Sequence, residues 1–122
     1  MNLRTRAALL RSMLNTLKQG HVELTSVSFD PRKKSADCAY EWQGSKLHAR
    51  IRVDAAQDGA LGAVLHELIH AHLDEPLSAV MDKGLVEHAI YGIEVCLVKW
   101  LEKHPRQYEI WRAAIAEKQE AE

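Results

Sequence analysis

Three residues in one short segment, His66, Glu67 and His70, combine metal-binding and acid–base side chains at the spacing of one helical turn. On a helix, positions four apart lie about 40° from one another in projection, so the two imidazoles can reach the same ion. Glu67 is rotated by about 100° from His66, which suits a base acting on a water at that ion better than a third ligand. The segment therefore predicts a Zn²⁺ cofactor with two histidine ligands and one general base.

A catalytic zinc ion usually has three protein ligands and one water, so a third ligand must come from elsewhere in the chain. The helix expected after the motif offers Glu87, His88 and Glu94. On a helical wheel the two glutamates lie on the flank of the apolar face, whereas His88 lies close to its opposite side. We favour Glu87, because it starts its helix and a short connection can return it to the metal. Glu94, as a structural acid or the ligand itself, and His88 remain alternatives.

Two more polar side chains near the motif have a structural and a chemical interpretation. His72 projects toward the apolar middle of the motif helix, and we interpret it as a hydrogen-bonded core histidine rather than a ligand. Tyr91 follows Glu87 by one helical turn, where a phenol could polarise a substrate carbonyl. Packing in the core or on the surface is the simpler interpretation of Tyr91.

Ahead of the motif, the pattern of apolar residues predicts one helix and a small sheet. An apolar stripe at helical spacing runs through residues 1–20 and ends at Gly20, which suits the left-handed position after a helix. Residues 22–29 are rich in strand-forming side chains. Alternation on both sides of a Gln-Gly turn predicts a β-hairpin over residues 38–53.

From Asp58 onward the apolar period changes to that of helices. The motif helix should start after Asp58 and stop before Pro76, because proline cannot continue the interior of a helix. A second helix is expected over residues 82–103, and a third should start at Pro105, since proline is favoured at the first helical position. The chain is therefore predicted to form a single α+β domain over residues 1–122, with a mainly antiparallel three-stranded sheet.

The composition is that of an ordinary soluble domain. Of the 122 residues, 47% are hydrophobic and 27% are charged, and the formal net charge is −1. This balance gives no reason to expect nucleic acid or a membrane as a partner, and charges interrupt every apolar stretch before the roughly twenty residues of a membrane span. Cys38 and Cys96 are interpreted as reduced core residues. We expect a cytoplasmic protein, although residues 1–20 are basic and acid-free like an organellar transit peptide.

The string H-E-L-I-H-A at residues 66–71, followed by E-H-A-I at residues 87–90, resembles the short gluzincins called minigluzincins, which include small phage and prophage metallopeptidases. A more distant similarity is to metallopeptidase domains of the ImmA/IrrE type. The resemblance implies a zincin-like fold with Glu87 as third ligand. Three residues after Glu87, this chain has Ile90 where the family pattern has alanine. The H-E-L-x-H-A string also occurs in SprT-like proteases, whose third ligand is a histidine.

Under this interpretation the chain hydrolyses a peptide or protein substrate. Zinc would polarise the scissile carbonyl and lower the pKa of its water, and Glu67 would take the water's proton and deliver it to the leaving amine. Related zincins bind the peptide along an edge strand before the motif helix, which we place at residues 47–53. The basic outer face of that strand is expected to be solvated. A zincin-fold binding or regulatory module without turnover and a metal-free helical interaction protein are the alternatives.

Overall fold

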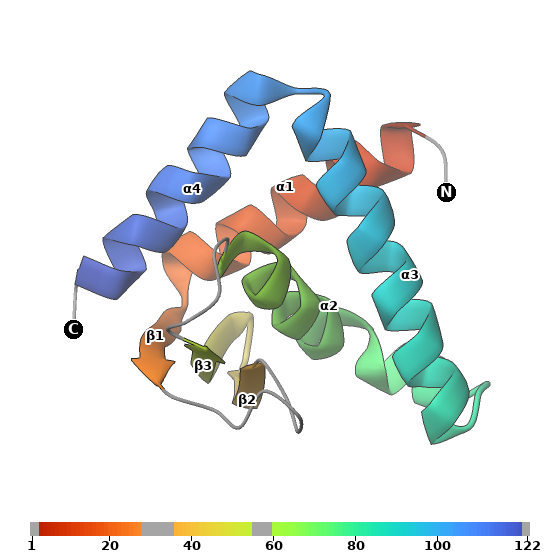
Figure 1. Cartoon of the computed structure of the whole chain (residues 1–122). Helices are drawn as coiled ribbons and strands as arrows, with labels where there is room; N and C mark the ends of the chain where they lie inside the picture. The colour runs from red at the N-terminus through yellow and green to blue at the C-terminus, as the bar shows by residue number, and fades with distance from the viewer. Residues whose placement is uncertain (1–2, 28–35, 55–59, 121–122) are drawn as a thin grey trace.

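The computed structural model describes residues 3–27, 36–54 and 60–120. The α+β class and the order of one helix, three strands and three helices are confirmed (Figure 1). The elements are α1 (Leu3–Gln19), β1 (His21–Val27), β2 (Ala36–Gln43), β3 (Lys46–Asp54), α2 (Ala60–Ser78), α3 (Lys83–Glu102) and α4 (Pro105–Glu120). None of the described helices has the length and apolar character needed to cross a membrane.

The three strands form a mixed sheet in the order β1-β3-β2. β1 pairs with β3 in parallel, and β2 pairs with β3 antiparallel, so the expectation of a mainly antiparallel sheet is corrected to one pairing of each kind. The predicted hairpin is present, and Gly44 at its turn has a φ of 64°, which glycine adopts without strain. β3 lies in the centre and is not the edge strand we expected.

The inward side chains of the strands are buried to different extents. The inward residues of β3, Leu47, Ala49 and Ile51, are all buried, and so are Val22 and Leu24 on the same face of β1. On the same face of β2, Tyr40 and Trp42 are each 37% exposed and combine an apolar ring with a polar atom. Such amphipathic side chains suit an edge of the sheet, where one end of the ring meets solvent.

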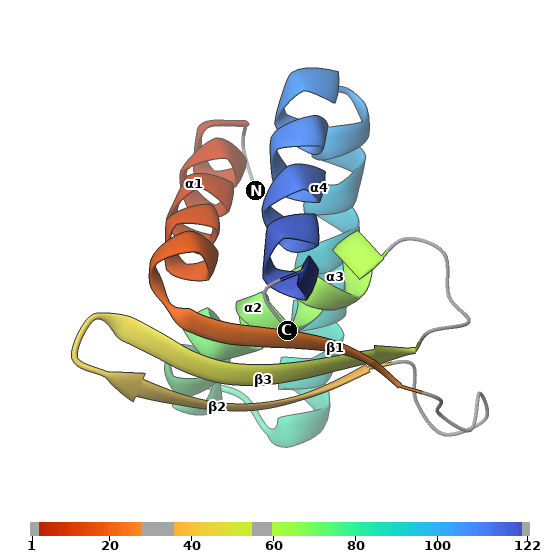
Figure 2. The same ribbon diagram turned by 90° about the vertical axis from the view of Figure 1, so that its left-hand side faces the viewer.

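The helices lie on one face of the sheet (Figures 1 and 2). The other face carries the alternate residues of β3, of which Lys46, Arg50 and Arg52 are exposed and His48 is half-buried against His21. The expectation of a solvated basic face is therefore confirmed. The apolar stripe of α1 packs into the core through three buried side chains, Leu10, Met13 and Leu17.

Gly20 ends α1 as expected, but for a different reason. Its φ is not positive, since Gly44 is the one described glycine with a positive φ. A Cβ added at Gly20 would instead lie 2.6 Å from the carbonyl oxygen of Leu47 and 2.8 Å from that of Thr16. The position requires glycine because β3 passes directly against the end of the helix.

The boundaries of two helices test the rules for proline and for helix caps. α2 does not stop before Pro76 but continues to Ser78, which corrects the sequence prediction. Pro76 lies in the last turn, where its missing N–H removes one hydrogen bond, and Leu73 and Leu77 pack that turn against the core. α3 follows the prediction within one residue at each end, with the Asp82 side chain accepting a hydrogen bond from the backbone N–H of Leu85.

Candidate metal centre

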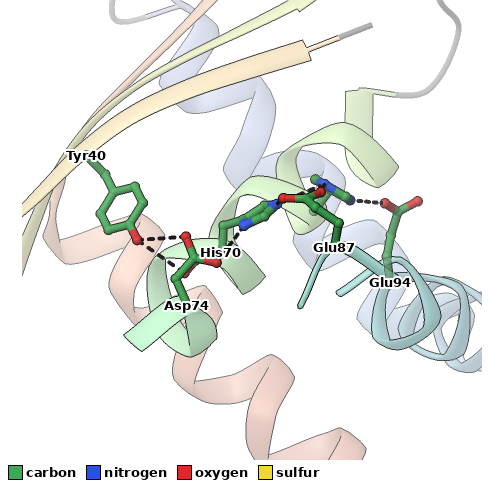
Figure 3. Close-up of polar contacts among 6 residues, drawn as sticks. Tyr40, His70, Asp74, Glu87 and Glu94 are labelled. Carbon is green, nitrogen blue, oxygen red and sulfur yellow. Dashed lines mark hydrogen bonds and ion pairs between the residues drawn. The ribbon is translucent and has the colours of Figure 1, made fainter. Parts of the chain in front are cut away.

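The centre is built on one flank of α2. The helix buries Val64, Leu65, Leu68 and Ile69 in the core, and this leaves His66 and His70 half-buried at the border between the core and α3. Figure 3 shows His70 of α2 and Glu87 and Glu94 of α3 directed toward the space between the two helices. The helical period thus brings the two histidines together, and the packing of α3 on α2 adds the carboxylates.

Three potential ligand atoms converge in that space. The Nε2 atoms of His66 and His70 lie 3.2 Å apart. A carboxylate oxygen of Glu87 lies 3.2 Å from His70 Nε2, and the other lies 4.0 Å from His66 Nε2. Zinc–nitrogen bonds of about 2.0–2.1 Å in a tetrahedron place neighbouring ligand atoms roughly 3.3 Å apart. The donor set and its spacing fit a metal ion.

The remaining ring nitrogens of both histidines are held by carboxylates. His66 Nδ1 lies 2.8 Å from Glu94 Oε1, and His70 Nδ1 lies 2.7 Å from Asp74 Oδ1. An ionised carboxylate only accepts hydrogen bonds, so each Nδ1 carries the proton and donates it. This tautomer leaves the lone pair of each Nε2 free, as in metal-ligating histidines whose other nitrogen is held by a carboxylate.

The electrostatics of the cluster favour a cation. In this tautomer the two Nε2 lone pairs and the Glu87 carboxylate are three acceptors that face one another without a donor between them. The hydrogen bond to Glu94 raises the pKa of His66 above its ordinary value, the charges of Glu67, Glu94 and Glu87 act in the same direction, and burial opposes them. The cluster therefore attracts positive charge, whether a proton or a metal ion.

The structure distinguishes the three candidates for the third ligand. His66, His70 and Glu87 form the one group of three such side chains in the described residues that could hold a metal ion. Glu94 takes the structural role considered for it, because it hydrogen-bonds the far nitrogen of His66. His88 is exposed and does not belong to the group.

Glu67 and Tyr91 are placed beside this group. Glu67 is half-buried next to His66, close enough for its charge to raise the pKa of that imidazole. Tyr91 is 60% exposed, which excludes packing in the core. It lies one turn beyond Glu87 on α3, so the two side chains share a face of the helix.

His72 is hydrogen-bonded and lies outside the possible metal group, as the sequence predicts, but it is half-buried and not part of the buried core. Its Nε2 lies 3.1 Å from the Thr16 hydroxyl of α1, and its ring stands edge-on to Trp42, with ring centroids 5.3 Å apart. Burial lowers the pKa of His72, because it removes the water that stabilises the charged ring.

Two residues of the site, Asp74 and Tyr40, were missed in the sequence. Asp74 follows His70 by four residues, a spacing at which helix side chains pair, so this signal was available. The Tyr40 hydroxyl donates to Asp74 Oδ2 at 3.0 Å and lies 3.4 Å from the carbonyl oxygen of His70. No local pattern connects β2 with α2. The sheet edge is joined to the site again by Trp42, whose Nε1 donates to the carbonyl oxygen of Ala71 at 3.0 Å.

No family model, curated protein or solved structure matches this chain.

Proposed function

We propose that this protein is a zinc-dependent metallopeptidase of the gluzincin type with a zincin-like fold. The observation that carries the proposal is the convergence of His66 Nε2, His70 Nε2 and a Glu87 carboxylate oxygen within 4.8 Å of one another. Each histidine is oriented by a carboxylate on its other nitrogen. An acid of the motif, Glu67, stands beside the group as the catalytic base.

The residues divide the work of hydrolysis. His66, His70 and Glu87 would hold the zinc ion, which when bound would supply a Lewis acid and lower the pKa of a bound water. Glu67 would accept a proton from the attacking water and return it to the leaving amine. Glu94 and Asp74 hold the imidazoles in the tautomer that keeps both Nε2 lone pairs available.

The sheet suggests where the peptide lies. β3 is paired on both sides, so the strand available for pairing next to α2 is β2, whose outer edge has no partner strand within the described sheet. Tyr40 and Trp42 fasten β2 to the helix that carries the histidines. We therefore place the substrate backbone along β2, where an extended peptide can add a strand.

The decisive experiment separates metal binding from turnover. Purified protein should hold one zinc ion per chain and cleave peptides from a broad library. Glu67→Gln should keep the zinc and lose about 10²–10⁴-fold in the rate of cleavage, the usual worth of a general base. If Glu67→Gln cleaves as fast as the parent, the proposal is wrong, and zinc binding without any cleavage would favour a binding module.

The third ligand is tested by a pair of neighbours. Glu87→Gln should weaken zinc binding, because it replaces a charged ligand by a neutral one. His88→Gln is the matched control on the next residue, and its exposed side chain should leave zinc binding unchanged. A loss of zinc with His88→Gln and none with Glu87→Gln would support the SprT-like alternative.

A further inference from the structure

We propose that Lys83 recognises a carboxylate of the substrate in a hollow beside the metal centre, an inference that rests on the proposed function. The carboxylate is either the side chain of an acidic residue or the C-terminus of the peptide. Lys83 is the first residue of α3, one turn before Glu87.

The hollow adjoins the site directly. It has a volume of about 420 Å³ and is lined by His70, Asp74, Ser78, Met81, Lys83, Val86 and Glu87. Two of these residues, His70 and Glu87, also belong to the group that could hold the metal. A substrate group that fills the hollow therefore lies next to the bond being cleaved, where its chemistry decides which peptides are accepted.

The three charged side chains that line the hollow are not equivalent. Both carboxylate oxygens of Asp74 already accept hydrogen bonds, one from His70 Nδ1 and the other from the Tyr40 hydroxyl. The Glu87 carboxylate faces the two Nε2 atoms. Lys83 is exposed and makes no hydrogen bond or ion pair with the described residues. The charge left for a ligand is that of the lysine.

The uncharged part of the lining defines the rest of the ligand. Met81 is partly exposed and Val86 is buried, so together they offer an apolar wall. An ammonium group beside an apolar wall suits a carboxylate on a short apolar stem, since the stem packs while the charges pair. A lysine or arginine of the substrate would be repelled by Lys83. Both acidic side chains and a C-terminal residue have the required chemistry.

The test measures binding, so that it does not depend on turnover. Zinc-loaded Glu67→Gln protein is titrated with labelled peptides in which Glu, Gln or Lys is walked along one sequence, each with a free or an amidated C-terminus. Fluorescence anisotropy gives the dissociation constants. The same titrations are made with Lys83→Met added, and with Lys103→Met as the matched control, which removes the same charge at the other end of α3.

Lys83→Met should weaken binding of the preferred carboxylate peptide about ten- to a hundredfold, the worth of a charge-assisted hydrogen bond. Peptides that lack the recognised carboxylate should bind Lys83→Met as well as they bind the Lys83 protein: these are the Gln peptides if a side chain is recognised, and the amidated peptides if the C-terminus is. Lys83→Arg should restore the preference, and Lys83→Glu should shift it toward peptides with lysine. A loss specific to Glu identifies a side-chain carboxylate, and one specific to the free terminus identifies the C-terminal carboxylate.

The inference is overturned if Lys83→Met leaves the preference for carboxylate peptides unchanged or weakens the binding of all peptides equally. It is also overturned if Lys103→Met has the same effect as Lys83→Met, or if no peptide binds. Cleavage by the parent protein answers the separate question of function. A parent that binds carboxylate peptides through Lys83 but never cleaves them overturns the peptidase and keeps the inference. A parent that cleaves peptides without a carboxylate preference supports the peptidase and overturns the inference.

Discussion

The two faces of α2 that carry histidines differ in the partner of each ring. On the face toward α3, His66 and His70 each donate from Nδ1 to a carboxylate, which leaves two Nε2 lone pairs 3.2 Å apart. On the face toward α1 and β2, His72 bonds to the Thr16 hydroxyl and packs against Trp42. Opposite pKa shifts follow, since Glu94 raises the pKa of His66 and burial lowers that of His72.

This difference teaches how a histidine that could bind a metal ion is distinguished from a structural one. His66, His70 and His72 are all half-buried and belong to one helix, so neither residue type nor exposure separates them. Two features separate His66 and His70 from His72. Their Nδ1 atoms are held by carboxylates, and their Nε2 atoms face other side chains that could bind a metal ion. If the comparison holds, substitutions on one face of α2 should leave the properties of the other face unchanged.

The largest effect is expected from removing a ligand. His70→Ala should weaken zinc binding by more than about a hundredfold, since loss of a ligand should exceed the cost of losing its hydrogen-bond partner. Competition with a chromophoric chelator measures the affinity. His72→Ala is the control from the other face, and an equal loss of affinity in that variant would contradict the comparison.

The carboxylates behind the histidines should come next. Glu94→Gln and Asp74→Asn should each weaken zinc binding by about 10–100-fold, because an amide is a poorer acceptor and no longer fixes the tautomer. Glu102→Gln provides an exposed acid of α3 as a control for the loss of charge. Unchanged zinc affinity in both site variants would show that the two carboxylates do not orient the ligands.

The face toward α1 should respond in stability. Thr16 donates its hydroxyl proton to the carbonyl oxygen of Ser12, so it accepts from His72 Nε2. His72→Ala should lower the free energy of unfolding by about 1–3 kcal/mol through this lost bond and the lost ring packing. Urea denaturation of the metal-free protein measures the change. A variant as stable as the parent would contradict the structural role.

The smallest effect is expected in the pH dependence of stability of the metal-free protein. The lowered pKa of His72 means that its contribution is present above the unfolded value of 6.5 and is lost as the pH falls below it. The raised pKa of His66 means that its contribution is present below 6.5 and is lost as the pH rises through the folded value.

Urea denaturation at several pH values compares the two contributions. His72→Gln should reduce the loss of stability on the acid side of pH 6.5, and His66→Gln should reduce the loss on the alkaline side. The two variants should therefore alter opposite limbs of the stability profile. A change of the same limb in both would contradict the opposite pKa shifts.

What the sequence determined by itself is the local part of this protein. Helical periodicity places His66 and His70 on one flank of α2, and the start of α3 at Lys83 follows from the Asp82 cap. Each of these features depends on residues within one or two turns, so no distant contact is needed to establish them. The hairpin of β2 and β3 is local in the same sense, because its turn and its alternation lie in one continuous stretch.

Only the tertiary structure decided how these pieces meet. Glu87 and Glu94 are seven residues apart, two turns and about 10.5 Å along one side of α3, so their wheel positions could not separate them. Because α3 crosses α2, Glu87 lies beside the Nε2 atoms of the two histidines, whereas Glu94 lies beside Nδ1 of His66. The strand order β1-β3-β2, which leaves β2 at the edge with Tyr40 beside Asp74, is likewise decided at long range, because β1 pairs with β3 and not with the next strand in the chain.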